Sequence, residues 1–247
     1  MFKKLAFIVI KKILKKFGYF NFGFPLYFLP DSGMGSHKKY LKFILSKLPK
    51  ENLTIIEVGS GNHSSKLFSK QAQSFLGRFI SFENNYEWHL KVKNKFKNTK
   101  NTKFLFLEKL NKKNIKFELD NLNIEEVSLS FIDSEPWESR TEALELLKLN
   151  SKIVVVHDVD YFPRNNLWGL EIDPIKNKPI NKYFYGKLKS ENLGLRNYDS
   201  IFEYWVEIFP IYPGYFTGPP MLIGSNFIDV RKIFDKTTPK GHYFFST

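Results

Sequence analysis

LTIIEVGSG, residues 53–61, places a short apolar run directly before a Gly-Ser-Gly turn. The apolar part, Leu53–Val58, has the length and the β-branched content of a buried strand. Gly59 and Gly61 allow the backbone to turn tightly and approach a ligand, and a helix is predicted just beyond them, over residues 64–76. This order predicts the first unit of a sheet in which strands and helices alternate.

The same alternation continues along the chain as far as residue 158. Further strands are predicted over residues 78–82, 103–107, 127–132 and 152–156, and further helices over 37–48, 85–97 and 137–149. Residues 201–209 and 221–226 are predicted to form a hairpin at the sheet edge. The predicted fold class is therefore α/β, with a doubly wound, mostly parallel sheet and a C-terminal antiparallel hairpin.

The 247 residues are best explained by one domain, residues 36–247, preceded by an arm, residues 1–35. Residues 159–200 break the periodicity with prolines and asparagines, and we expect a lid-like insertion there. The hydrophobic content of 43% excludes global disorder. The absence of cysteine excludes disulfides, Cys-ligated zinc, iron–sulfur clusters and thiol nucleophiles.

The net charge of +13 is concentrated in two segments. Residues 1–50 contain eleven Lys and one acidic residue, and residues 91–116 contain ten Lys and one acidic residue. Such segments favour anionic partners, which include a membrane surface, nucleic acid or an acidic substrate. The second segment is typical of a solvated helix face and lacks interleaved aromatics, so nucleic acid is the less favoured partner.

Residues 1–17, MFKKLAFIVIKKILKKF, have the pattern of a basic amphipathic helix. The longest apolar run, residues 5–10, is far shorter than the roughly 20 residues that span a bilayer. Two interpretations stay open: the helix lies on an anionic membrane, or it packs its apolar face on the domain. We therefore expect a cytoplasmic protein, peripheral on the inner face of a membrane under the first interpretation.

The candidate functional residues directly follow predicted strands. They are Glu83, Glu108, Asp133, His157 and Asp158. Because parallel strands end at one edge of a sheet, where ligands bind, we expect these side chains to gather there. A carboxylate in the position of Glu83 can accept hydrogen bonds from both ribose hydroxyls, which predicts a nucleoside-containing cofactor. No Gly-Lys-Ser/Thr follows the glycine turn, and this excludes a P-loop.

The segments IIEVGSG (55–61), FE (82–83), FID (131–133) and VVVHD (154–158) occur in the order found in class I S-adenosylmethionine-dependent methyltransferases. The chain resembles this family over residues 53–227. The resemblance implies a Rossmann-like, seven-stranded sheet and S-adenosylmethionine as the cofactor. It also implies a cofactor site that comprises Glu57, Gly59, Ser60, Gly61, Glu83, Glu108 and Asp133, with the glycines at the methionine, Glu83 at the ribose and Glu108 near the adenine.

Residues 131–133, with Ser139-Arg140 and Ala143-Leu144, further resemble the small-molecule and glycan O-methyltransferases. This implies methyl transfer to a hydroxyl of a small molecule or a glycan precursor. The segment DSEPW, residues 133–137, is not the Asp/Asn-Pro-Pro-aromatic tetrapeptide of methylases that act on amino groups of nucleic-acid bases.

A hydroxyl acceptor needs a base or a metal ion to become nucleophilic. His157, Asp158 and Asp133 are the candidate catalytic residues, although His157 is equally explained as a structural side chain bonded to a backbone carbonyl. Asp133 and Asp158 follow adjacent strands and are placed to share a divalent ion such as Mg²⁺, with Asp160 as a further ligand. Val159 stands where a third ligand is expected, so the metal requirement stays open.

Two further residues have more than one interpretation. His37 is expected on the surface at the start of a helix, and lining the acceptor pocket is the alternative. Arg140 either pairs with an acidic acceptor or caps its own helix. For the whole protein, the alternatives to O-methylation are an RNA methyltransferase, or a non-catalytic, membrane-associated protein on a cofactor-binding fold.

Overall fold

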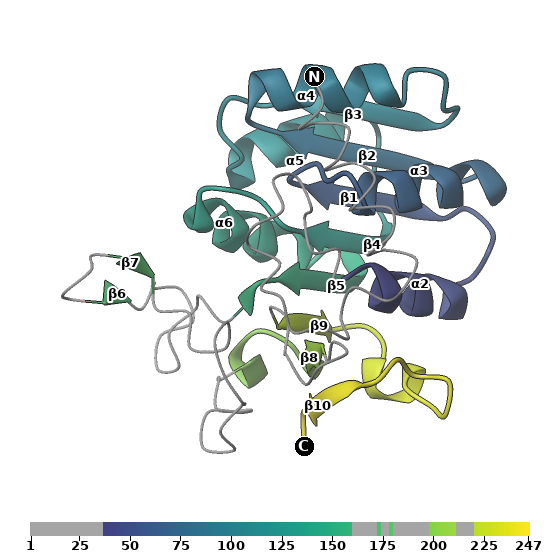
Figure 1. The fold of residues 1–247 in the computed structure, drawn as a ribbon, viewed down its shortest axis with the longest axis vertical. Helices are drawn as coiled ribbons and strands as arrows, with labels where there is room; N and C mark the ends of the chain where they lie inside the picture. Colours follow the sequence, from purple (N-terminus) through teal and green to yellow (C-terminus); the bar gives the residue numbers. More distant parts are fainter. Residues whose placement is uncertain (1–36, 160–171, 174–177, 180–197, 211–219) are drawn as a thin grey trace, which may run out of the picture.

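The computed structural model describes residues 37–159, 172–173, 178–179, 198–210 and 220–247, and its main feature is an eight-stranded sheet (Figure 1). The strands lie in the order β10-β8-β9-β5-β4-β1-β2-β3. They are β1 (Thr54–Val58), β2 (Arg78–Glu83), β3 (Thr102–Phe106), β4 (Val127–Ile132), β5 (Ser151–His157), β8 (Tyr204–Pro210), β9 (Met221–Ser225) and β10 (Gly241–Phe245). The first five are parallel, whereas β9 is antiparallel to both β5 and β8, and β10 is antiparallel to β8.

Helices cover both faces of the sheet. They are α2 (Lys38–Lys47), α3 (Ser64–Ser74), α4 (Tyr86–Lys95), α5 (Lys112–Asn121) and α6 (Trp137–Leu147), with two short 3₁₀ turns, η5 (Tyr198–Ser200) and η6 (Val230–Ile233). Successive strand side chains point to opposite faces. Ile55 accordingly packs in the core beneath α2 and α3, and Ile56 packs in the core beneath α5 and α6. The result is a three-layer arrangement with two apolar cores.

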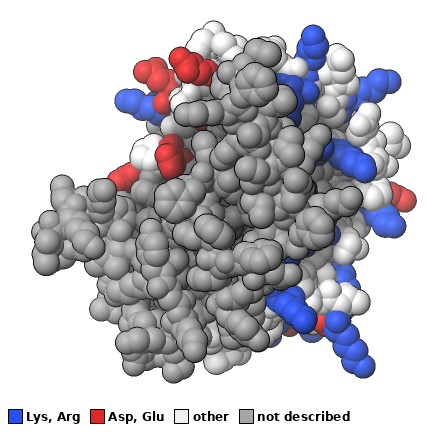
Figure 2. Space-filling model, in the orientation of Figure 1, with Lys and Arg blue, Asp and Glu red and all other residues white. Residues whose placement is uncertain are grey.

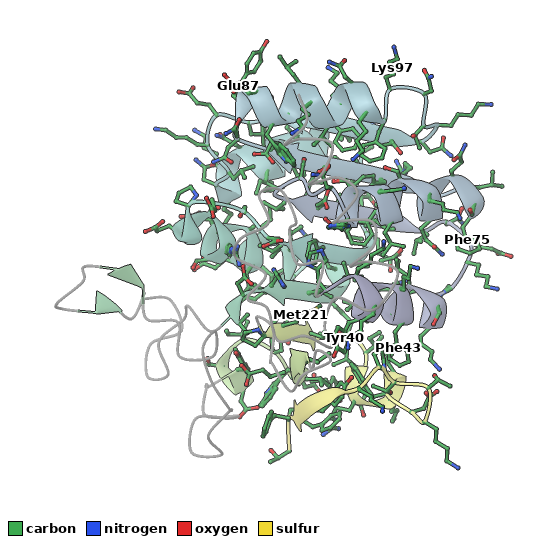
Figure 3. The ribbon with its side chains drawn as sticks, in the orientation of Figure 1. Tyr40, Phe43, Phe75, Glu87, Lys97 and Met221 are labelled. Carbon is green, nitrogen blue, oxygen red and sulfur yellow. The ribbon has the colours of Figure 1, made fainter. Side chains whose placement is uncertain are left out.

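The C-terminal segment packs on the first described helix. The Tyr40 hydroxyl on α2 donates a hydrogen bond to the carbonyl of Lys240 at 2.6 Å. The ring of Phe43 lies 5.6 Å from the ring of Phe234. Figure 3 labels both α2 side chains, beside the yellow C-terminal elements. These contacts join α2 to the segment between η6 and β10.

The predicted α/β sheet, with its parallel strands and antiparallel hairpin, is confirmed, but two elements were not predicted. Helix α5 contributes only Ile115 and Leu119 to the core, so its helical periodicity rests on one buried pair within a Lys-rich segment. Strand β10 is a short aromatic run after a proline-containing turn. Because β10 pairs with β8 and β9 lies between β5 and β8, the sheet has eight strands and the hairpin is not at its edge.

Other predicted features fall partly or wholly on residues that the structure leaves out. Residues 1–35, the predicted arm, lie outside the described residues. Within residues 159–200, the predicted lid, the structure describes residue 159, η5 and one antiparallel pair, β6 (Ile172–Asp173) with β7 (Lys178–Pro179). Among the described helices, none has both the length and the apolar content that a membrane crossing requires.

The Lys-rich segment at residues 91–116 lies on α4, β3, α5 and their connections. All ten of its Lys side chains are exposed. Figure 2 shows blue cationic side chains projecting at the top and right of the described surface. Strand β3 is an edge strand, and lysines on such a strand oppose pairing with another chain, which fits the interpretation as a solvated surface.

Candidate active site

Strand register brings the predicted residues to one edge of the sheet. Val58 of β1 pairs with Phe82 of β2 and with Ile132 of β4, and Ile132 pairs with Val156 of β5. The next residue of each strand therefore stands in a single row, which consists of Gly59, Glu83, Asp133 and His157. This alignment confirms that the strand ends meet, as the sequence predicts.

The glycine turn lies in close contact with the neighbouring strand end. Gly59 has a φ of +89°, a conformation that side chains other than hydrogen rarely adopt. A Cβ at Gly59 would lie 2.7 Å from the Cα of Ser134 and would collide with the carbonyl of Asp133. The close contact between the ends of β1 and β4 is therefore sufficient to require glycine at this position.

Glu57 lies beneath the glycine turn and is completely buried. Its Oε2 accepts hydrogen bonds from the hydroxyls of Ser65 at 2.5 Å and Ser81 at 2.6 Å. Ser65 Oγ also accepts a hydrogen bond from the amide of Gly61 at 3.0 Å. Burial raises the pKa of Glu57 to about 7, although the serine hydrogen bonds oppose this shift. Glu57 supports the turn from below, and direct contact with a cofactor stays a prediction.

Glu83 fastens the turn from the end of β2. Its Oε2 accepts a hydrogen bond from the amide of Ser60 at 2.9 Å, and its Oε1 accepts from the amides of Asn84 and Asn85 at 3.0 and 2.8 Å. Burial raises the pKa of Glu83, while these amide hydrogen bonds act in the opposite direction. A carboxylate has about four acceptor sites. Three are occupied here, which leaves one for a ribose hydroxyl, and contact with both hydroxyls stays a prediction.

Asp133, His157 and Asp158 form a charged cluster that is held together by Arg140. Arg140 is 2% exposed, and its Nη2 lies 3.0 Å from Asp133 Oδ1 and 3.5 Å from Asp158 Oδ2. Its Nε donates to the carbonyl of Ser134 at 2.8 Å, and its Nη1 donates to the carbonyl of His157. Arg140 therefore contacts the strand ends and does not cap its own helix, whereas pairing with an acidic acceptor stays a prediction.

His157 is oriented by the two carboxylates. Its Nδ1 donates a hydrogen bond to Asp133 Oδ1 at 3.2 Å and lies 3.1 Å from Asp158 Oδ1. Asp158 has a φ of +56°, a left-handed conformation that Asp tolerates better than most residues. The side chain of His157 therefore faces two carboxylates. Its backbone carbonyl accepts a hydrogen bond from Arg140.

The cluster shifts the pKa values of its members in different directions. Burial disfavours the charged form of His157, but Asp158 and Asp133 outweigh burial and raise its pKa. Burial likewise opposes ionisation of Asp133, yet His157 and Arg140 hold the pKa of Asp133 well below its usual range. Burial, together with the charge of Asp133, raises the pKa of Asp158. These shifts keep Asp133 ionised beside a histidine that binds a proton readily.

His37 is part of this site and not a surface residue, which corrects the favoured prediction. Its side chain is 7% exposed, and its ring lies 4.7 Å from that of His157, edge to face. The ring also lies 5.2 Å from that of Phe131. Burial and the neighbouring charge of His157 lower the pKa of His37 to about 3, so the imidazole is neutral.

A hard divalent ion shared by Asp133 and Asp158 does not fit this arrangement. The guanidinium of Arg140 lies within 3.0–3.5 Å of both carboxylates and occupies the position of the cation. Magnesium requires near-ideal octahedral geometry and oxygen ligands, which a competing guanidinium removes.

The remaining predicted residues lie apart from the cluster or outside the described residues. Glu108 follows β3 and is exposed, and among the described residues it makes no hydrogen bond that could fix it near a nucleotide. Asp160 lies outside the described residues. Sequence reasoning missed Trp88, whose Nε1 donates to the carbonyl of Ser60 at 2.7 Å. No local pattern marks that contact, because it joins α4 to the glycine turn. A cavity bordered by Arg78 and Lys103 lies where β2 and β3 begin, at the opposite edge of the sheet.

Comparison with solved structures identifies the architecture. An O-methyltransferase from Bacillus cereus, solved in complex with SAH, matches with a TM-score of 0.50 and 12% identity, covering 80% of this chain and 82% of that chain. The chain has a methyltransferase fold. A SAM-dependent methyltransferase from Aquifex aeolicus is similar at a TM-score of 0.41 and 19% identity, covering 76% of this chain and 88% of that one.

The similarity to YjhP from E. coli has a TM-score of 0.35 and 13% identity; it covers 49% of this chain and spans about half, 48%, of that one. A scan against models of protein families gives no match. A search of curated proteins also finds no relative. The methyltransferase fold is thus established by structure, and the B. cereus enzyme carries that conclusion.

Proposed function

We propose that this protein is an S-adenosylmethionine-dependent methyltransferase that acts on a hydroxyl group of a small molecule or glycan precursor. The observation that carries the proposal is the row formed by Gly59, Glu83, Asp133 and His157 at one edge of a methyltransferase-fold sheet. The B. cereus O-methyltransferase, solved with SAH, supports this choice of cofactor and acceptor.

The cofactor half of the site consists of the glycine turn and Glu83. S-adenosylmethionine, when bound, supplies an electrophilic methyl group on a sulfonium and leaves as the neutral thioether. Glu83 would accept one ribose hydroxyl through its remaining acceptor site, while its other hydrogen bonds hold Ser60, Asn84 and Asn85 in place. The turn is thereby fixed before the ligand arrives, which reduces the entropy lost on binding.

The acceptor half of the site is the Asp133–His157 pair. Bound S-adenosylmethionine would supply the methyl group to the acceptor oxygen, and the acceptor hydroxyl would give up its proton at this pair. With no metal ion bound, the imidazole of His157 takes this proton. Its Nδ1–H stays hydrogen-bonded to Asp133, and both carboxylates stabilise the cation that results. Alignment of the acceptor supplies the rest of the rate enhancement.

Calorimetric titration with S-adenosylmethionine and S-adenosylhomocysteine tests the cofactor. We expect micromolar binding to the wild type and about ten- to a hundred-fold weaker binding to Glu83→Gln and Glu83→Ala, since a hydrogen bond to a charged group is lost. Glu87→Ala is the matched control because Glu87 is an exposed carboxylate on the adjoining helix (Figure 3). Absence of binding at millimolar cofactor would overturn the proposal and favour the non-catalytic alternative.

A further inference from the structure

We propose that His37, His157 and Asp133 form a binding site for a borderline first-row dication of the zinc type. One ring nitrogen of each histidine and one carboxylate oxygen of Asp133 lie within 4.8 Å of one another. Two imidazoles and a carboxylate are a donor set that binds Zn²⁺ and leaves one coordination position open. The inference deepens the proposed function and rests on it for its purpose, but ion binding itself requires no cofactor.

His37 supplies the independent evidence for a ligand. Within the part of the chain that the structure describes, neither its Nδ1 nor its Nε2 has a hydrogen-bond partner, although the side chain is 7% exposed. A buried polar group without a partner costs about 1–3 kcal/mol. An ion that accepts the lone pair of a neutral imidazole would remove this cost. The low pKa of His37 agrees with a ring that stays neutral.

The donors are close to the separation that an ion needs. Zinc binds imidazole nitrogen at about 2.0–2.1 Å, so the donors of a tetrahedral site lie roughly 3.4 Å apart. At the observed limit of 4.8 Å, the most distant pair of donor atoms would have to approach by about 1.4 Å on ion binding.

The residues around the three donors have the character of a supporting shell. Asp158 Oδ1 lies 3.1 Å from His157 Nδ1 without a hydrogen bond, so it adds negative charge beside the ring, and Asp133 accepts the hydrogen bond of Nδ1. Arg140 binds Asp133 through Oδ1, and the second carboxylate oxygen, Oδ2, accepts no hydrogen bond from the described residues. Asp133 can therefore offer Oδ2 without breaking its contact with Arg140.

The charge of the cluster also favours a dication. Two carboxylates and one guanidinium leave one formal negative charge when both histidines are neutral. A dication would change this to one positive charge, which would favour the deprotonated form of a hydroxyl acceptor bound beside it. His157 then serves as a ligand, and Asp158 is the adjacent group that can take the proton.

The donor set distinguishes this site from the magnesium site predicted between Asp133 and Asp158. Imidazole nitrogen suits zinc and its neighbours, whereas magnesium prefers oxygen ligands. The site should therefore bind Zn²⁺ or Co²⁺ far more tightly than Mg²⁺. This selectivity gives a test that does not depend on catalysis.

Titration of the chelator-treated, tag-free chain with Co²⁺ tests the inference through the visible absorption of the bound ion. We expect one Co²⁺ per chain, absorption bands of low-coordinate geometry, displacement by equimolar Zn²⁺ and no displacement by a large excess of Mg²⁺. His37→Leu and His157→Leu should each weaken Co²⁺ binding at least about ten-fold. His89→Leu is the matched control, since His89 is also buried but lies on α4, away from the cluster.

The outcomes separate this inference from the proposed function. Absence of Co²⁺ bands in the wild type, displacement by Mg²⁺, or unchanged binding in a folded His37→Leu variant would each overturn the metal site. Circular dichroism shows whether each variant is folded. If neither histidine variant folds, the competition between Co²⁺, Zn²⁺ and Mg²⁺ in the wild type decides whether the metal site exists. Cofactor binding measured on the same samples by calorimetry tests the methyltransferase proposal separately.

Discussion

Arg140 balances the charge of two carboxylates, those of Asp133 and Asp158, which would otherwise be unfavourable to bury. Its guanidinium contacts both carboxylates and also donates hydrogen bonds to the carbonyls of Ser134 and His157. Replacement by Met should leave two uncompensated carboxylates and lower the free energy of unfolding by about 3–5 kcal/mol. Arg140→Lys should recover only part of this loss, because an ammonium group cannot reach both carboxylates at once.

Urea unfolding at pH 7 measures this effect. Arg78→Met is the control, since Arg78 is exposed at the start of β2 and its loss should change stability by no more than about 0.5 kcal/mol. Equal losses in the Arg140 and Arg78 variants would show that the buried cluster does not depend on its guanidinium.

Glu57 should make stability depend on pH. Its pKa is raised from 4.5 to about 7 in the folded protein, so the folded state keeps a proton that the unfolded state releases. The free energy of unfolding should therefore fall as pH rises from 4.5 to 7, by about 3 kcal/mol in total. Glu57→Gln mimics the protonated form and should remove this slope, whereas Glu87→Gln should keep it. Parallel curves for wild type and Glu57→Gln would contradict the prediction.

At the scale of single residues, the sequence predicts which groups meet but not what they bind. Asp133 and His157 can be placed because each follows a strand, and strand ends of a parallel sheet share an edge. The partners of Arg140 and the burial of His37 depend on how α6 and α2 pack over that edge. No spacing within either helix encodes this packing.

At the scale of the elements, the glycine turn after β1 should be more sensitive to an alanine substitution at Gly59 than at Gly61. Gly59→Ala meets the backbone of Asp133 and Ser134 at a φ of +89°, so we expect a loss of about 2–4 kcal/mol in stability. At Gly61, an added Cβ meets only the hydroxyl of Ser64, which can rotate away. Gly61→Ala should therefore cost about 1 kcal/mol or less.

Thermal unfolding with and without cofactor separates stability from binding in these two variants. Gly59→Ala should unfold at a lower temperature even without ligand. A normal melting temperature for Gly59→Ala, with cofactor binding abolished, would mean that the residue serves the ligand and not the contact between strands.

Elements with strong periodicity were predictable, and elements with weak periodicity were not. Strands β1, β4 and β5 are mostly apolar and almost fully buried, because helices cover both of their faces. Helix α5 buries only two side chains, and none of the described side chains of β10 is fully buried, so their patterns merge with those of loops. The position of β9 between β5 and β8 could not be read from the hairpin pattern, which is the same for either order.

For the whole molecule, the outstanding question is how the basic arm is used. We propose that residues 1–17, which lie outside the described residues, bind an anionic membrane through their amphipathic pattern. Deletion of residues 1–17 should lower sedimentation with phosphatidylglycerol vesicles and leave cofactor binding unchanged. Wild-type binding should also weaken as salt is raised. Unchanged sedimentation would support the alternative, in which this segment packs on the domain.

The strand order imposes a sequence of events on the growing chain. Strands β1 to β5 form one half of the sheet from consecutive segments, and this half can assemble as it leaves the ribosome. The free edge of β5 pairs with β9, and β9 emerges only after the long segment that follows residue 158. Until then β5 presents an unpaired, apolar edge, which is the kind of surface that chaperones bind and that drives aggregation. Expression at a reduced rate or with added chaperone capacity should therefore improve the folded yield.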